Sequence, residues 1–198
     1  MRVGVRGYEP GWVVDFERVR VALVGALDSV DVVAIEHVGS TSVPGLAAKP
    51  VLDIDVVVAA GSVRSAIDEL TAAGYQDEGE RGIPGRHALR APADGVHRHV
   101  YVCVDGSLAL RNHLAVRDLL RADPELRDEY AALKLALGDR ELDDVEEYVA
   151  RKSAFLQRVL ERAGVSPSDR AEIAHQNPTE DGRATRVAGS GDAVGPHL

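Results

Sequence analysis

The chain has 198 residues, of which 45% are hydrophobic. A chain of this length buries enough apolar surface to form a core without disulfide bonds. Its single cysteine could not form a disulfide bond within the chain. The formal net charge of −9 argues against a general nucleic-acid binder held by phosphate contacts, but it leaves room for a local basic pocket. No run of about 18 apolar residues is present and the N-terminus lacks the apolar segment of a secretory signal, so we expect a cytoplasmic protein without a membrane span.

The first elements along the chain are a helix and two strands. Residues 12–28 carry apolar side chains at spacings of three and four, which predicts an amphipathic helix. Residues 30–38 are short and rich in β-branched side chains, as are residues 51–59. Both segments are therefore predicted to be strands.

A second helix and a pair of strands follow. Residues 62–75 are predicted to form a helix with Ser62 as its N-cap and Gly74 as its C-terminal stop. Residues 86–106 are predicted to form two strands joined by the turn PADG. Cys103 lies in the second of these strands, where a small buried hydrophobe is the favoured interpretation over a nucleophile.

From residue 107 the pattern is helical. Three helical segments follow, and Pro124 suits the first position of the middle one. From Val165 the chain has glycines, prolines and scattered aliphatic residues without a period, which predicts a disordered tail. The expected organisation is an α/β domain over residues 1–106, a helical region packed on it over residues 107–164, and a tail over residues 165–198.

Two carboxylates stand in the apolar strand 51–59. Side chains alternate along a strand, so Asp53 and Asp55 project to the same face, with Cα atoms about 6.6 Å apart. Two carboxylates roughly 4–5 Å apart repel each other by about 3–4 kcal/mol at an effective dielectric constant of 20. A divalent cation, a basic partner or a raised pKa must offset that repulsion. A buried strand with acids at its exposed end is an equally good interpretation.

A hard cation bound by carboxylates and accompanied by phosphates is typical of Mg²⁺. Two acids aimed into one cleft suit metal-assisted nucleotidyl transfer. Gly39 allows close approach of the backbone to a phosphate, while Ser40 and Thr41 add hydroxyl and N–H donors.

These residues resemble a known family. A hydrophobic residue followed by Gly-Ser, a short gap and then Asp-x-Asp resembles the signature of the nucleotidyltransferase superfold. The longer string EHVGSTSVPGLAAKPVLDI at 36–54 is similar to the GrpB family, members of which also occur fused behind dephospho-CoA kinase. Further similar segments are YEPGW at 8–12, HRHVYV at 97–102 and residues 113–134 and 147–155, so that the resemblance covers about residues 5 to 160.

The resemblance implies a nucleotidyltransferase-like mixed α/β sheet with a C-terminal helical region. It places Gly39 and Ser40 at the nucleotide phosphates and Asp53 at a metal ion. Asp55 matches the second acid of the superfold, although many GrpB relatives have a non-acidic residue there. The third carboxylate of the superfold has no counterpart here, because His97 and His99 occupy the corresponding strand. A variant site that contains histidine is therefore an option.

The histidines have several interpretations. His37, His97 and His99 are expected near the carboxyl ends of neighbouring strands, where they could bind a metal ion together with Asp53. They could equally donate hydrogen bonds to phosphates or stiffen the sheet.

Two lysines are further candidates. Lys152 interrupts the apolar stripe of the last helix, between Tyr148 and Phe155, so it either extends its ammonium group to solvent or points into a cleft toward a phosphate. Lys49 precedes the strand with the two acids and is either a phosphate ligand or a solvated loop residue. His113 and Arg117, one helical turn apart, could contribute to a cleft between the sheet and the helices, although the polar boundary of their helix is the favoured interpretation.

The leading hypothesis is Mg²⁺-dependent transfer of a nucleotidyl or phosphoryl group from a nucleoside triphosphate to a small acceptor. Electrostatic positioning would carry most of the catalysis. The assigned roles are metal binding by Asp53 and Asp55, phosphate binding by Gly39, Ser40 and Thr41, charge stabilisation by Lys152 or Lys49, and general-base catalysis by His97 or His99. The alternatives are a nucleotide- or CoA-binding module without turnover and a lyase or hydrolase reaction on the same scaffold. The sequence specifies neither the acceptor nor the oligomeric state.

Overall fold

The protein folds around one mixed β-sheet, seen in a computed structural model that describes residues 4–138 and 145–176. The sheet order is β1-β2-β5-β4-β3. Neighbouring strands are antiparallel except for β2 and β5, which are parallel. The strands are β1 (Val32–Val38), β2 (Leu52–Val58), β3 (Gln76–Asp77), β4 (Arg86–Arg90) and β5 (Arg98–Val104). The predicted strands are confirmed, and the two-residue edge strand β3 is an addition.

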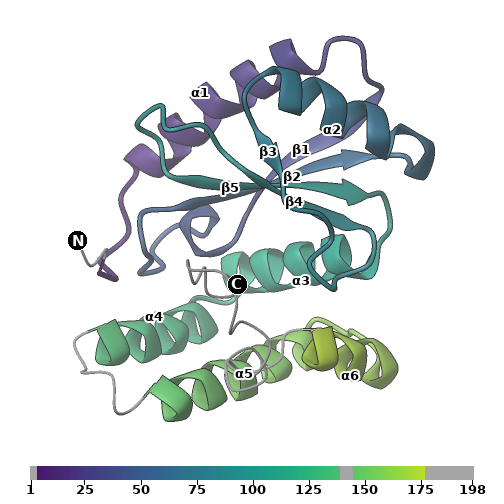
Figure 1. The fold of residues 1–198 in the computed structure, drawn as a ribbon. Coiled ribbons are helices and arrows are strands. Elements are labelled where there is room, and N and C mark those ends of the chain that lie inside the picture. Colours follow the sequence, from purple (N-terminus) through teal and green to yellow (C-terminus); the bar gives the residue numbers. More distant parts are fainter. Residues whose placement is uncertain (1–3, 139–144, 177–198) are drawn as a thin grey trace.

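Helices cover both faces of the sheet (Figure 1). Helices α1 (Gly11–Ala26) and α2 (Val63–Ala72) lie on one face, and α3 (Leu108–Ala122) lies on the other. A further layer beyond α3 contains α4 (Pro124–Gly138), α5 (Val145–Arg162) and α6 (Pro167–Gln176). The predicted fold class, a mixed α/β sheet with a C-terminal helical region, is confirmed.

The two helices on the first face follow the predicted pattern. In and just after α1, the buried residues are the predicted stripe of Trp12, Phe16, Val19, Leu23 and Leu27. Helix α2 ends as predicted, because Gly74 has φ +93° and the N–H of the next residue, Tyr75, donates to the carbonyl of Leu70. Ser62 stands at the N-cap of α2, but its side chain makes no capping hydrogen bond.

The main apolar core lies between the sheet and α1 and α2. Strand residues Leu52, Ile54 and Val56 of β2, with Val100 and Val102 of β5, face these helices and are almost fully buried. On the opposite face a smaller cluster surrounds Cys103, which is completely buried and has a thiol pKa strongly raised by burial. The cysteine behaves as the small hydrophobe that the sequence predicts.

A second core holds the helical layer together. It includes Leu120 of α3, Leu126 and Tyr130 of α4, and Phe155, Leu156 and Val159 of α5. Val43 and Leu46, from the loop between β1 and β2, are buried in the same core. The loop that follows Gly39 is therefore packed against the helices.

The prediction of a disordered tail from Val165 is wrong for residues 165–176. Helix α6 forms there, and it buries Ile173. Asp169 pairs with Arg111 of α3 at 2.9 Å, and the carbonyl of Arg170 accepts a hydrogen bond from Gln157 of α5. A single buried apolar residue, Ile173, does not produce a helical hydrophobic period that can be detected in the sequence. Helix α6 is instead supported by its tertiary contacts. The rest of the predicted tail, residues 177–198, lies outside the described residues. Among the residues that the structure describes, no helix is long and apolar enough to cross a membrane.

Candidate functional site

The candidate site lies where β1 ends and β2 and β5 begin. Gly39 directly follows β1, Asp53 is the second residue of β2, and His99 is the second residue of β5. Asp53 is paired with Val38 on one side and with His99 on the other. The prediction that the histidines lie at carboxyl ends of strands holds for His37 of β1 but is wrong for His97 and His99, which lie just before and at the amino end of β5.

Asp53 is held between Gly39 and His99. One of its oxygens, Oδ1, lies 3.0 Å from Nδ1 of His99, and 14% of its side chain is exposed. Gly39 has φ +67°, and a Cβ atom there would lie 2.2 Å from Oδ2 of Asp53. Only glycine therefore fits at position 39, because the backbone passes directly against the carboxylate.

Asp55 projects to the same face as Asp53 but is closed off. Its side chain is completely buried, and its Oδ2 lies 2.8 Å from Nδ1 of His113 on α3. Oδ1 of Asp55 is buried without a hydrogen-bond partner in the part of the chain that the structure describes. Beside it, burial and the negative charge of Asp53 raise the pKa of Tyr101. A histidine from the covering helix thus meets the second carboxylate.

A lysine that the sequence analysis did not select contacts the Gly-Ser turn. Nζ of Lys134, on α4, makes a hydrogen bond with Oγ of Ser40 and lies 4.8 Å from the centre of the Tyr130 ring. The residue is only 7% exposed. Burial, and then the positive charge of Lys152, lower the pKa of Lys134 to about 7; Lys49 adds to this effect, and the charge of Asp53 opposes it.

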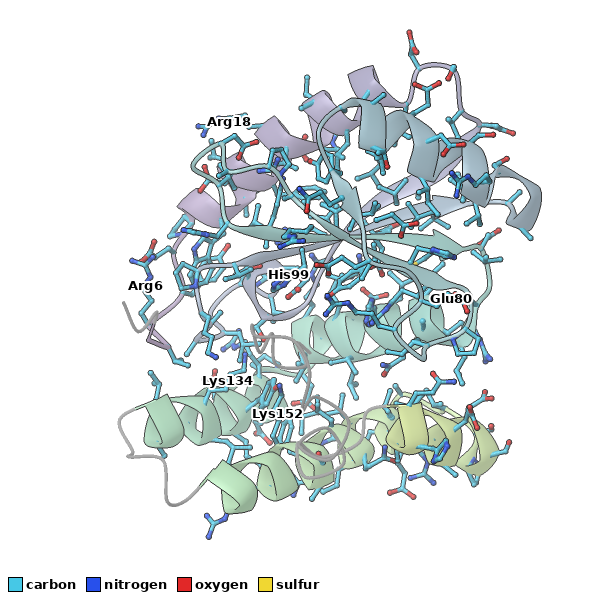
Figure 2. All side chains as sticks on the ribbon, viewed as in Figure 1. Arg6, Arg18, Glu80, His99, Lys134 and Lys152 are labelled. Atoms are coloured by element: carbon cyan, nitrogen blue, oxygen red, sulfur yellow. The ribbon has the colours of Figure 1, made fainter. Side chains whose placement is uncertain are left out.

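Lys134 and Lys152 lie close together on α4 and α5, beneath the end of the sheet that carries His99 (Figure 2). Lys152 is half-buried, and Lys49 is exposed in the loop that leads into β2. Three lysines from three separate segments therefore lie near one another, and one of them, Lys134, contacts Ser40.

Arginines hold the loop after Gly39 from the helical side. Arg121 of α3 donates from Nε and Nη2 to the carbonyl of Ser42, at 3.0 and 2.8 Å. Arg117 donates to the carbonyl of His37 at 3.2 Å, and Arg127 donates to that of Pro44 at 3.4 Å. The position of the Gly-Ser turn therefore depends on α3 and α4.

Three predicted site residues point elsewhere. The hydroxyl of Thr41 is buried and contacts Nε2 of His37 and the carbonyl of Val51, so it does not face a ligand. His37 stacks on Phe16, and burial, followed by the positive charge of Arg121, lowers its pKa to about 4. His97 is exposed before β5, where its carbonyl accepts the N–H of Leu52.

A pocket opens beside the Gly-Ser turn. Its polar end contains Ser40, Asp53, His113 and Arg117, and its apolar wall is formed by Val38, Val43, Val116, Leu120 and Tyr130. Arg117 is paired with Glu36 of β1 at 2.5 Å and lines this pocket together with His113, so the less favoured interpretation, a contribution to the cleft, is the one that the structure supports.

Comparison with known proteins places this arrangement in a family. A family model described as GrpB protein matches residues 2–162. The chain belongs to the GrpB family. It is 38% identical over 167 residues to a UPF0157 protein of Streptomyces coelicolor, a match that covers 84% of this chain and 87% of that protein. The crystal structure of conserved protein GrpB from Enterococcus faecalis has a TM-score of 0.69 and 35% identity, covering 80% of this chain and 96% of the other.

The GrpB resemblance stated from the sequence is therefore confirmed. The chain is also 32% identical over 155 residues to a dephospho-CoA kinase of Mycolicibacterium paratuberculosis, which covers 65% of this chain and 38% of that kinase. A structure of Cid1 in complex with its short product ApU matches 75% of this chain with a TM-score of 0.47 and 16% identity, which is too distant to support a function.

The site of this GrpB protein offers limited ligands for a metal ion. Among the described residues, no group of three or more His, Cys, Asp or Glu side chains could hold one, so the predicted alternative of a histidine-rich centre does not form. Asp53 lines the pocket, whereas Asp55 is completely buried beneath His113 and does not line it. A single accessible carboxylate still fits Mg²⁺, which often takes one or two protein carboxylates and completes its shell with phosphate and water.

A simple signal in the sequence marks Lys134. This GrpB chain has 23 lysines and arginines, of which only Lys49, Lys134 and Lys152 are lysines. Lys49 and Lys152 both lie near enough to Lys134 to lower its pKa. Arginine stays charged, whereas lysine is a compact charge whose pKa shifts readily on burial. The choice of lysine over arginine, together with the position of Lys134 one turn after buried Tyr130, could have identified it.

Proposed function

We propose that this GrpB protein binds a nucleoside triphosphate with Mg²⁺ and transfers a nucleotidyl or phosphoryl group to a small acceptor in the cytoplasm. The observation that carries the proposal is the grouping of all three lysines of the chain around Lys134, which contacts Ser40 of the Gly-Ser turn. In a protein with a net charge of −9, this local cluster of ammonium groups beside the turn suits an anion with several charges.

The phosphates would lie along the Gly39–Ser40 turn. Lys152 and Lys49, which come from separate segments, would pair with phosphate oxygens as point charges. The arginines that bind the loop carbonyls keep the turn in place before a ligand arrives. A preorganised cationic site stabilises charge in the transition state without reorganisation.

Asp53 would be the protein ligand of Mg²⁺, and phosphate and water oxygens would complete the shell of the ion. The ion would neutralise phosphate charge and stabilise the charge that develops on the transferred group. His99 is the better placed of the two predicted bases. Its Nδ1 faces Asp53, which orients the ring, and its side chain is 26% exposed, so that an acceptor hydroxyl could approach the ring.

Titration calorimetry with several nucleotides, with and without Mg²⁺, tests this proposal. We expect Mg²⁺ to tighten binding, and Asp53→Asn to abolish the effect of Mg²⁺ and weaken binding by at least about tenfold. Asp105→Asn, an exposed aspartate just after β5, is the matched control and should bind like the natural protein. Equal nucleotide affinity for Asp53→Asn and the natural protein would refute the metal assignment.

A second candidate function is nucleotide binding without turnover. It is favoured by the closure of Asp55 beneath His113 and by the presence of His99 and Tyr101 at the positions of β5 that face Asp53 and Asp55. Pyrophosphate or phosphate release in the presence of candidate acceptors separates the two functions. Binding without release across nucleotides and acceptor classes would support the binding module.

A further inference from the structure

Ser40 is the hydroxyl of its turn that faces the pocket. The short helix η1 (Ser40–Ser42) contains three hydroxyl residues. Thr41 donates to the carbonyl of Val51, and Ser42 donates to that of Gly39 at 2.6 Å. Ser40 lines the pocket, and its Oγ contacts Nζ of Lys134. A serine hydroxyl that lines the pocket and a buried amine thus share a hydrogen bond.

The surroundings of Lys134 favour its neutral form. The groups that face it are Ser40, the ring of Tyr130 on its own helix, Lys152 of α5, Lys49 before β2, and Asp53 of β2. Burial and the two neighbouring ammonium groups outweigh the carboxylate, so that the pKa is lowered to about 7. A lysine that is desolvated and placed near other cations is a recognised way to obtain a basic amine at neutral pH.

We propose that Ser40 is a nucleophilic serine whose proton is taken by Lys134, and that this pair cleaves esters with a small apolar acyl group. The inference goes beyond nucleotide transfer and does not depend on it. The apolar wall of the pocket, which includes Val38, Val43 and Leu120, would accommodate the acyl chain beside Ser40. Lys152 and Lys49 would stabilise the negative charge that forms on the carbonyl oxygen.

The reaction balances with water as the second substrate. Oγ of Ser40 attacks the ester carbon and forms a C–O bond, while its proton passes to Nζ of Lys134. The tetrahedral intermediate then expels the alcohol, which leaves with that proton. Water attacks the acyl-serine, its proton passes through Lys134 to Oγ of Ser40, and the carboxylic acid is released. Serine–lysine pairs of this kind are known variants of the serine–histidine arrangement.

A fluorophosphonate probe tests the pair directly, because Oγ forms a bond to phosphorus, fluoride leaves and Lys134 takes the proton. We expect mass spectrometry to find one adduct per chain on the peptide that contains Ser40, with labelling that speeds up as pH rises through about 7. Ser40→Ala should remove the adduct. Ser65→Ala, an exposed serine on α2, is the matched control and should label like the natural protein.

The lysine variants separate a base from a simple contact. Lys134→Met places an apolar side chain of similar length in the buried position and removes the amine. Lys134→Arg keeps a positive charge there, but its guanidinium group cannot release a proton. Both should label at least tenfold more slowly, and hydrolysis of p-nitrophenyl butyrate should fall in parallel. Labelling of the natural protein at the rate of Ser40→Ala, or undiminished labelling of a folded Lys134→Arg, would overturn the inference. Neither result bears on the calorimetric test of nucleotide binding.

Discussion

The two faces of the sheet are built on the same strands but are packed in different ways. Toward α1 and α2, β2 presents Leu52, Ile54 and Val56, and the contact is apolar throughout. Toward α3, the same strand presents Asp53 and Asp55. Because side chains alternate along a strand, one face of β2 packs into the apolar core and the other carries the two carboxylates of the candidate site.

The polar face is a poor source of stability. Burial of apolar surface contributes about 25 cal/mol per Å², whereas a buried ion pair gains little after its desolvation cost. The pairs of Asp55 with His113 and of Glu36 with Arg117 are nevertheless retained under α3. This contrast indicates that the polar face is maintained for the pocket it borders, and the following variants test that view.

The largest expected effect comes from breaking the buried pair on the polar face. His113→Ala leaves the carboxylate of Asp55 buried without a partner, which should lower the free energy of unfolding by about 3–5 kcal/mol. Denaturant titration measures it. The double variant Asp55→Leu/His113→Leu should recover most of this loss. If the double variant is as unstable as His113→Ala, the polar face does contribute stability and the contrast fails.

A variant on the apolar face should cost stability alone. Leu23→Ala removes a side chain that is almost fully buried against the sheet, and should lower the free energy of unfolding by about 2–5 kcal/mol. Nucleotide affinity of the folded protein should stay unchanged, as measured by calorimetry well below the melting temperature. Val21→Ala, on the exposed side of the same helix, should stay within about 0.5 kcal/mol. A change of affinity in Leu23→Ala would show that the two faces are coupled.

Lys134 should make stability depend on pH above neutrality. Its pKa is about 7 in the folded protein and about 10.5 in the unfolded chain, so between these values the unfolded chain binds more protons. Stability from this group is therefore lowest below pH 7 and rises with pH, by at most about 1.4 kcal/mol per pH unit. Thermal or denaturant unfolding at pH 7 and 9 should show the rise, and Lys134→Met should remove it. An equal rise in that variant would assign it to other groups.

The smallest effect is local to the site. Gly39→Ala would place a methyl group within 2.2 Å of Oδ2 of Asp53 on a backbone with φ +67°, so Asp53 must move. We expect Mg²⁺-dependent nucleotide affinity to fall by at least about tenfold, or about 1.4 kcal/mol. Gly25→Ala in α1, where no atom lies within 4 Å, should leave affinity unchanged and stabilise the helix by about 0.5–1 kcal/mol. If Gly39→Ala binds the nucleotide as tightly as the natural protein, then the close contact between the backbone at position 39 and Asp53 is not required for Mg²⁺-dependent binding.

Local patterns predicted the first face well. The stripe of residues 12–27 and the glycine stop of α2 depend on helical periodicity and on backbone conformation, both of which are written in neighbouring residues. The site was predicted less completely. Gly39, Ser40 and Asp53 do come together, but Thr41 and His37 are turned into the structure, and Lys134 was missed because its helix is far away in sequence.

The sequence by itself determined the elements, the alternation that puts Asp53 and Asp55 on one face, and the choice of lysine at three positions. Only the tertiary structure decided that β5 starts beside Asp53, that His113 closes over Asp55, and that Lys134 contacts Ser40 with Lys49 and Lys152 nearby. The physical reason is the separation in sequence over which each kind of interaction acts. Periodicity acts between neighbours, whereas strand direction and helix docking depend on contacts between residues that lie 46 to 94 positions apart, as for Asp53 with His99 and Ser40 with Lys134.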